Sequence, residues 1–216
     1  MQIERDEAIR LLAARDLGRL TLHERADQLG IMSLDGWDRH PAWEELPAEL
    51  RRELEAGGRI ADPGDPRYDV LLRPLLAEGY WGASNAYLLA ELGGDHDEVL
   101  GEPPGLAACP CCGLCTLRER ASFEICPVCW WEDDGQDDAD APRALGGPNG
   151  PLSLTRARIN VLRAGIYDLA RDDLRMLQEP RAKYPVGRRF ALGEGDEVRD
   201  LDSGWVGRLA DEVSLG

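Results

Sequence analysis

The hydrophobic and polar positions in the first hundred residues follow the pattern of a series of short helices. Apolar residues recur every three or four positions across residues 3–20, with arginine, aspartate and glutamate between them. This spacing predicts an amphipathic helix that ends near Gly18. Thr21, followed three residues later by Glu24, is the capping-box pattern that begins a second helix. We expect Gly30 to end that second helix.

Three further helices are predicted before residue 100. Pro47 suits the first turn of a helix that the glycine pair at 57–58 would end. Two more helices are expected around residues 66–78 and 84–92, and Ser84 is the expected N-cap of the last one. The N-terminal region is therefore predicted to be helical.

The second half of the chain has a less regular pattern. The proline-rich stretch EPPG at 102–105 marks a boundary. Two short β-like pieces, TLRE and SFEIC, follow it, and a helix capped by Ser153 or Thr155 comes after an acidic run. Loose alternation around residues 202–204 suggests a β-hairpin.

Charge adds a candidate partner to this picture. The 216 residues carry a formal net charge of −16, and residues 95–140 hold 12 acidic and 2 basic residues. Such a surface repels phosphate backbones, so unaided nucleic-acid binding is disfavoured. It would attract a basic partner protein. The plain alternative is that the acidity only keeps the chain soluble.

The ends and apolar runs of the chain indicate its compartment. The first residues, MQIERDE, lack the basic start and apolar core of a signal peptide. Apolar runs such as VLL at 70–72 are too short to span a bilayer. We therefore expect a cytoplasmic protein, in which thiols stay reduced.

All six cysteines lie within 21 consecutive positions. Cys109 and Cys112 form one Cys-x2-Cys pair, and Cys126 and Cys129 form another. Two residues between ligands let the backbone turn so that both thiolates face one point about 2.3 Å away, the Zn–S distance. Two such turns complete a tetrahedral site without a vacant position. The spacing therefore predicts a structural zinc ion held by these four cysteines.

The residues around the first pair support this choice of ligands. Pro110 presets the turn, and Gly113 permits the positive φ that often closes it. Cys111 and Cys115 are surplus, although Cys112 and Cys115 form a competing pair that lacks the proline. We expect Cys111 to be a neighbouring thiol that faces away from the metal.

Other chemistries for these cysteines have less support. A disulfide cluster is disfavoured in a cytosolic chain of this size. Redox Cys-x2-Cys motifs occur singly, not as a facing pair. An iron–sulfur cluster uses similar ligands, and spacing alone does not exclude it. Arg118 and Arg120 are expected to offset part of the negative charge of the thiolates.

Two tryptophans and an acidic run follow the last cysteine. We expect one of Trp130 and Trp131 to cover the metal turn and the other to join the helical layer. The functional alternative is an exposed aromatic anchor for a partner. The carboxylates of residues 132–140 do not have the alternating spacing of a calcium loop, so a solvated acidic turn is expected.

Signals for catalysis are weak. His23, His40 and His96 lie far from the cysteines in sequence, and none has a motif partner. The sequence has no glycine-rich phosphate loop after a strand, no Gly-x-Ser-x-Gly elbow and no His-Glu-x-x-His motif. No catalytic or cofactor-binding residue is therefore assigned.

Three motifs carry a resemblance to a known family. They are CPCCG at 109–113, ICPVCWWEDDGQDD at 125–138 and GGPNGPLSLTRARIN at 146–160. From about residue 106 to 162 the chain resembles the bacterial cysteine-rich CPCC domain family. Members usually lack a cysteine at the place of Cys115, which supports the two Cys-x2-Cys pairs as ligands. The resemblance implies a small zinc-ribbon-like module and supplies no reaction.

The sequence as a whole predicts an α+β protein. It would have a helical N-terminal region over 1–100, a zinc-ribbon-like CPCC domain over 105–165, and a C-terminal helix with a short β tail over 166–216. The expected function is non-catalytic. A structural zinc site would stabilise a loop-rich segment that has little apolar surface to bury. An acidic surface would bind a basic protein partner.

One specific version of this function is an immunity or antidote protein that blocks a basic toxin by charge complementarity. Two alternatives stay open. One is a nucleic-acid-associated zinc ribbon, and the other is an enzyme with its site in the N-terminal region. A pocket lined by convergent carboxylates or histidines would favour the enzyme.

Overall fold

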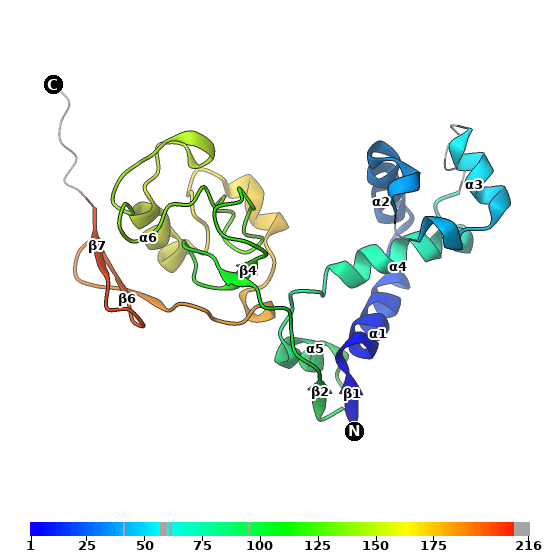
Figure 1. The fold of residues 1–216 in the computed structure, drawn as a ribbon, viewed down its shortest axis with the longest axis horizontal. Helices are drawn as coiled ribbons and strands as arrows, with labels where there is room; N and C mark the ends of the chain where they lie inside the picture. The colour runs from blue at the N-terminus through cyan, green and yellow to red at the C-terminus, as the bar shows by residue number, and fades with distance from the viewer. Residues whose placement is uncertain (41, 57–59, 61, 95, 210–216) are drawn as a thin grey trace. The chain divides into compact units, whose positions relative to one another are not determined.

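The structure of the protein, a computed structural model, describes residues 1–40, 42–56, 60, 62–94 and 96–209. The chain divides into two units, Met1–Pro103 (unit 1) and Pro104–Gly216 (unit 2). Helices and short strands occur together, which confirms the predicted α+β class (Figure 1). None of the helices in the described ranges has the length and apolar character that crossing a bilayer requires.

Unit 1 contains five α-helices and two short strands among its described residues. In chain order they are β1 (Gln2–Glu4), α1 (Arg5–Leu17), α2 (Leu22–Asp35), α3 (Ala48–Glu55), α4 (Asp69–Glu78), α5 (Asn85–Leu92) and β2 (Glu98–Leu100). Short 3-10 turns lie at Trp37–Arg39, Trp43–Glu45 and Pro66–Tyr68. These turns connect α2 to α3 and lead into α4.

The first helix begins two residues later than predicted. Residues 2–4 form β1, which pairs in parallel with β2, so that Ile3 lies opposite Val99. Both side chains are buried, and they share a core cluster with Leu12 of α1. The local pattern placed Ile3 in a helix because its strand partner lies almost a hundred residues away in sequence.

The capping box of the second helix is present. The Thr21 hydroxyl accepts a hydrogen bond from the Glu24 N–H at 3.2 Å, and the Glu24 carboxylate accepts one from the Thr21 N–H at 2.8 Å. The predicted end at Gly30 is wrong, because α2 continues to Asp35 and Gly36 follows it with φ 93°. A single helical glycine costs only about 1 kcal/mol, and burial of Met32 beyond it favours continuation.

The remaining helices of unit 1 lie close to their predicted places. Pro47 is the N-cap of α3, and the glycine pair expected to end that helix lies outside the described residues. The helix predicted from residue 66 begins as a 3-10 turn and becomes α4 at Asp69. Ser84 caps α5, with its hydroxyl accepting from the Tyr87 N–H at 3.1 Å.

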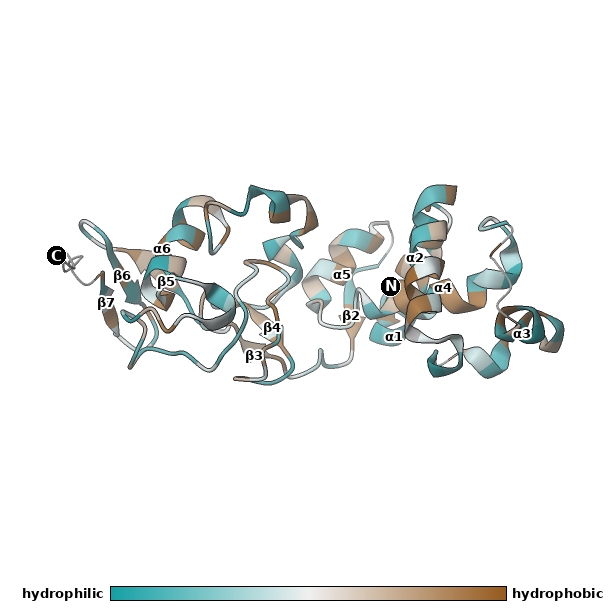
Figure 2. Cartoon of the chain, turned by 90° about the horizontal axis from the view of Figure 1, so that it is seen from above, coloured by the Kyte–Doolittle hydropathy of each residue, from teal (hydrophilic) through white to brown (hydrophobic). Residues whose placement is uncertain are grey.

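Two apolar clusters hold unit 1 together. One joins α2, α3 and α4 through Leu29, Leu50 and Leu71, all 0 % exposed. The other joins β1, β2, α1 and α5 and includes Leu12 and Leu88. Figure 2 shows the hydrophobic character of α4, which packs in the first cluster.

Unit 2 has one α-helix and several short strands among its described residues. They are β3 (Ala107–Ala108), β4 (Cys115–Leu117), α6 (Leu154–Ala164), β5 (Phe190–Leu192), β6 (Glu197–Asp200) and β7 (Val206–Arg208). Further 3-10 turns lie at Gly147–Asn149, Asp172–Leu177 and Arg181–Lys183. Strands β3 and β4 pair antiparallel, and β5, β6 and β7 form an antiparallel sheet in that order.

Local predictions in unit 2 were partly right. The stretch TLRE overlaps β4, but residues 122–126 form no strand, and Ile125 makes only an isolated bridge with Glu132. Ser153 is the cap of α6, and its hydroxyl accepts from the Arg156 N–H at 3.2 Å. The hairpin around residues 202–204 joins β6 to β7, and β5 adds a third strand that the pattern did not predict.

Candidate metal centre

Four cysteine side chains converge in the core of unit 2. They are Cys109, Cys112, Cys126 and Cys129, and their sulfur atoms all lie within 4.8 Å of one another. Sulfur–sulfur distances of 3.7 Å separate Cys109 from Cys129 and Cys112 from Cys126. Four sulfurs at tetrahedral corners, each about 2.3 Å from a common centre, would be roughly 3.8 Å apart. The four cysteines could therefore hold a metal ion.

Both Cys-x2-Cys pairs lie on turns of the same geometry. In the first turn the Gly113 N–H donates to the carbonyl oxygen of Cys109, and in the second the Trp130 N–H donates to that of Cys126, both at 2.9 Å. The residue after each pair has a left-handed backbone, with φ 80° at Gly113 and φ 68° at Trp130. Glycine adopts this conformation without strain, whereas a tryptophan there is uncommon.

The first turn leaves no room for a side chain at Gly113. A Cβ atom added there would lie 2.1 Å from the carbonyl oxygen of Arg188. The carbonyl oxygen of Gly113 in turn accepts hydrogen bonds from the N–H groups of Gly187 and Arg188, at 2.9 and 2.8 Å. The segment before β5 therefore packs directly on the first cysteine turn.

The thiols of the cluster titrate in a buried environment. Burial raises the pKa of Cys109 and of Cys129 well above the ordinary thiol value. Burial alone would also raise the pKa of Cys126, but hydrogen bonds from the three other cysteines and from Thr116 hold it well below that value. The Thr116 hydroxyl donates to the Cys126 sulfur at 3.2 Å. The four thiols titrate together, so the site favours one thiolate shared within the cluster, and a bound cation would favour thiolates at all four cysteines.

The two surplus cysteines differ in exposure. Cys111 is buried beside the cluster, and its thiol is close enough to Cys129 to affect the pKa of that thiol. Cys115 lies in β4 and is partly exposed. All six cysteines are free thiols, and none forms a disulfide. The assignment of four of them as ligands stays a prediction.

Segments far along the chain hold the second turn. The Tyr167 N–H donates to the carbonyl oxygen of Cys129 at 3.0 Å, and the Glu179 N–H donates to that of Pro127 at 2.9 Å. Trp131 is fully buried and packs edge-to-face on Tyr167, with the ring centroids 6.1 Å apart. Trp130 is partly buried against the same cluster. Trp131 therefore belongs to the core of unit 2, and Trp130 packs against the edge of that core.

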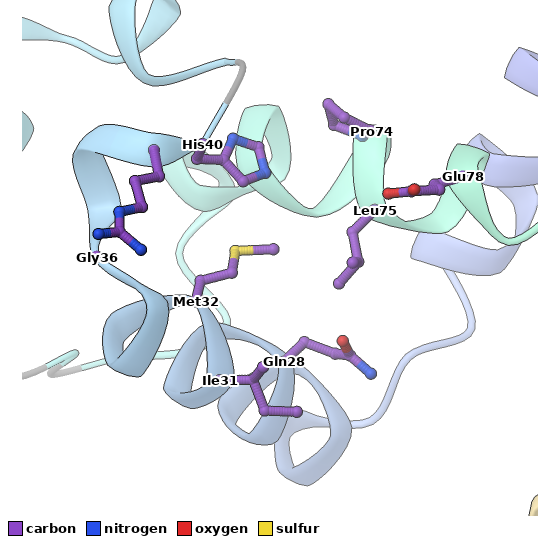
Figure 3. Close-up of a pocket in the computed structure, with 9 residues that line it drawn as sticks. Gln28, Ile31, Met32, Gly36, His40, Pro74, Leu75 and Glu78 are labelled. Carbon is purple, nitrogen blue, oxygen red and sulfur yellow. The ribbon is translucent and has the colours of Figure 1, made fainter. Parts of the chain in front are cut away.

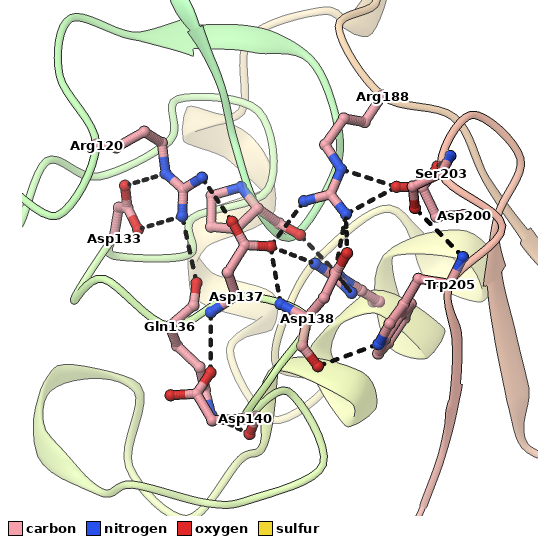
Figure 4. A network of polar contacts seen from close by, with 12 residues as sticks. Arg120, Asp133, Gln136, Asp137, Asp138, Asp140, Arg188, Asp200, Ser203 and Trp205 are labelled. Atoms are coloured by element: carbon pink, nitrogen blue, oxygen red, sulfur yellow. Dashed lines mark hydrogen bonds and ion pairs between the residues drawn. The ribbon is translucent and has the colours of Figure 1, made fainter.

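The acidic run after the cysteines is a partly buried, ion-paired network, so the prediction of a solvated turn was wrong for the aspartates at 133, 137 and 138 (Figure 4). Asp133 is 0 % exposed and accepts from Arg120 Nε at 2.7 Å and from the Ala121 N–H at 2.8 Å. Arg120 also pairs with Asp137 at 2.9 Å. Arg120, expected to offset thiolate charge, thus neutralises carboxylates.

Arginines from the C-terminal part of the chain complete this network. Arg188 pairs with Asp137 at 2.8 Å and with Asp138 and Asp200 at 2.7 Å each. Partial burial would raise the pKa of Asp137, but hydrogen bonds from Arg120 and Arg188 hold it well below its usual range. Arg188 lies about fifty residues from Asp137 and Asp138 in sequence, which is why the local pattern indicated a solvated turn.

The histidines of the chain all lie in unit 1. His23 is exposed, and its Nε2 atom lies 3.5 Å from a carboxylate oxygen of Asp27. The Nδ1 atom of His40 accepts from the Ala42 N–H at 3.1 Å, the His40 side chain also hydrogen-bonds to the Leu71 backbone, and burial lowers its pKa. His40 is therefore a packed side chain that joins the segment after α2 to α4.

The comparisons with known proteins concern unit 2. Residues 107–183 match the profile of a family described as Cysteine-rich CPCC. The match confirms the predicted resemblance. It also extends beyond residue 162 and so includes Tyr167 and Glu179, which contact the second cysteine turn. No curated protein and no solved structure matches the chain.

Proposed function

We propose that this chain, which carries a cysteine-rich CPCC domain over residues 107–183, is a non-catalytic zinc protein whose acidic surface binds a basic partner protein. The observation that carries the proposal is the closed set of four sulfurs, 3.7 Å apart in two pairs and buried in the core. Four thiolates in tetrahedral arrangement suit Zn²⁺ and leave no position for a substrate or water. The metal would therefore be structural.

The composition of the core explains why unit 2 would need the ion. Its apolar cluster includes the four candidate ligands, so thiols take the place that aliphatic side chains would otherwise fill. The strands are two to four residues long and one α-helix packs on them. Small units with so little regular structure commonly depend on metal binding for their folding free energy. A reducing cytoplasmic compartment, which we also propose, would keep the thiols available.

The net negative charge of the chain lies mainly on unit 1. Residues 1–103 carry 22 acidic and 11 basic residues, whereas residues 104–216 carry 19 and 14. Within unit 2 the aspartates at 133, 137 and 138 are already paired with arginines. A basic partner is therefore expected to meet unit 1. In its narrower form the proposal is an immunity or antidote role against a basic toxin, motivated by this charge.

Zinc removal tests the structural part of the proposal. The purified chain is treated with a chelator, and tryptophan fluorescence and far-UV circular dichroism are followed. We expect the environment of Trp131 to change as unit 2 unfolds, while the helices of unit 1 keep most of the helical signal. The Cys115→Ser variant should respond like the parent chain. Retention of native fluorescence after complete zinc removal would contradict a structural metal.

Capture of partners from the native host tests the interaction. We expect basic proteins to be retained and to be released as salt is raised, because the attraction between exposed charges is screened. Each retained protein is then purified and its binding measured directly. Recovery of acidic partners alone would count against the proposal.

A further inference from the structure

A pocket of about 320 Å³ opens on unit 1 between α2, the Trp37–Arg39 turn and α4 (Figure 3). Met32 of α2 and Leu75 of α4 point into it. Among its other lining residues, Ile31 and Glu78 are exposed to solvent. The volume is at the lower end of the range for ligand pockets and suits one or two apolar side chains.

The surface beside the pocket is also apolar. Ile31 is 56 % exposed and Leu34 is 89 % exposed. The two residues are three positions apart on α2, so they lie on the same face of the helix. We call Ile31, Leu34 and the pocket the α2 face. Large apolar side chains exposed next to a pocket are typical of protein-binding sites.

Acidic side chains flank this apolar surface. Asp27 lies one helical turn before Ile31, and its side chain is 60 % exposed. Asp38 lies close to Gly36, which lines the pocket. A Cβ atom added at Gly36 would be 3.1 Å from a carboxylate oxygen of Asp38. Arg39 supplies a cation to the lining, but residues 1–103 have a net charge of −11. The charge around the α2 face therefore complements a basic occupant.

The wall of the pocket is held in place before any partner binds. His40 lines the pocket, and its hydrogen bonds to the backbone of Ala42 and Leu71 join the loop after α2 to α4. Met32 packs in the same core cluster as Leu71. A preformed wall lowers the conformational entropy that binding would cost.

We propose, as a step that rests on the proposed function, that the α2 face binds a basic amphipathic helix of a partner protein. An apolar side chain of that helix enters the pocket between Met32 and Leu75, and a second contacts Leu34. Lysine or arginine side chains beside them meet Asp27 and the other carboxylates of unit 1. A second copy of this chain is a poorer occupant, because two units of charge −11 repel each other.

Binding of model peptides to the zinc-loaded full chain tests this assignment. The probe is a fluorescently labelled helical peptide with leucine along one face and lysine along the other. One control peptide has the same composition in scrambled order, and another has glutamate in place of lysine. Fluorescence anisotropy measures binding to the parent chain and to Leu34→Asp and Ile31→Asp. Leu177→Asp serves as the matched control, because Leu177 is a 62 % exposed leucine in unit 2.

We expect the lysine peptide to bind and Leu34→Asp and Ile31→Asp to weaken it by about tenfold or more, as loss of a central apolar anchor does. Leu177→Asp should bind within about twofold of the parent. Equal binding of the scrambled peptide, or equal loss in Leu177→Asp, would overturn the proposal. A dimer of the parent chain that Leu34→Asp dissociates would also overturn it and assign the face to a second copy.

The failure of this inference is distinguishable from failure of the proposed function. If basic partners from the host still bind Leu34→Asp as tightly as they bind the parent chain, the assignment of the α2 face as the binding site is wrong, and the proposed function stands. If no basic partner binds any variant, the interaction part of the proposed function itself is wrong.

Discussion

The Nε atom of Arg158, on α6, donates a hydrogen bond to the carbonyl oxygen of Pro110, in the first cysteine turn, at 2.8 Å. The Arg158 side chain is fully buried, and its guanidinium lies 4.4 Å from the ring centroid of Phe190 and 4.5 Å from that of Trp205. It also pairs with Asp138 at 2.8 Å. One side chain thus connects the first cysteine turn, the acidic network and the sheet of β5, β6 and β7.

Replacing Arg158 should therefore destabilise unit 2. In Arg158→Ala the buried packing and the ion pair with Asp138 are lost together, and we expect a loss of about 3–5 kcal/mol in unfolding free energy. Chemical denaturation of the zinc-loaded chain, followed by tryptophan fluorescence, measures this change.

The control for this change is Arg163→Ala on the same helix. Arg163 is exposed and pairs with Asp196 at 2.8 Å. Exposed ion pairs contribute about 1 kcal/mol at most, so this variant should stay close to the parent. Equal losses of unfolding free energy in the two variants would show that the contribution of Arg158 to stability does not come from its burial.

Gly113→Ala should impair the first cysteine turn. The added Cβ would meet the carbonyl oxygen of Arg188, a backbone atom, at 2.1 Å, and the φ of 80° is strained for alanine. We expect weaker zinc retention and a loss of about 2 kcal/mol or more in stability. A zinc-competition titration with a chromophoric chelator reads the first effect.

Gly105→Ala is the matched control for that titration. A Cβ at Gly105 would meet nothing within 4 Å, and its φ lies outside the left-handed region. This variant should hold zinc as the parent chain does. If Gly113→Ala also held zinc with unchanged affinity, the packing of Arg188 on the turn would not constrain the site.

Asp200 should contribute stability throughout the neutral range. Its side chain is 1 % exposed and pairs with Arg188. Burial would raise its pKa, but hydrogen bonds from Arg188 and from the N–H groups of Asp202 and Ser203 lower it to about 2. Since the folded pKa lies below the unfolded value of about 3.9, the stabilisation is fully present above pH 5 and is lost as pH falls through 2.

The expected result for Asp200→Asn is a loss of about 2 kcal/mol at pH 7 that stays constant down to about pH 5. Urea unfolding at several pH values measures the difference between the two proteins. Below pH 5 protonation of the thiolates is expected to release the metal from both. A difference that already shrinks between pH 7 and 6 would contradict the lowered pKa.

Features that depend on a few neighbouring residues were predictable from the sequence. Thr21 with Glu24 and Ser84 identified the starts of two helices, and Ser153 was one of two candidate caps for a third, because a cap depends on residues within one turn. The two Cys-x2-Cys pairs indicated the place where four sulfurs converge, since the turn itself brings each pair together.

Features that join distant segments were not predictable. Charge counting over residues 95–140 indicated an acidic surface, yet Arg158 and Arg188 approach from far along the chain and neutralise part of it. The parallel pairing of β1 with β2 depends on residues almost a hundred positions apart. The left-handed backbone conformation of Trp130 was also not predictable, because the sequence has no glycine at that position to indicate it.

The central claim is that Cys109, Cys112, Cys126 and Cys129 bind one zinc ion. Elemental analysis of the purified chain, alongside Cys126→Ser and Cys115→Ser, tests it most directly. We predict about one zinc per chain in the parent and in Cys115→Ser, and far less in Cys126→Ser. Iron in place of zinc, no metal in the parent, or full zinc retention in Cys126→Ser would contradict the account.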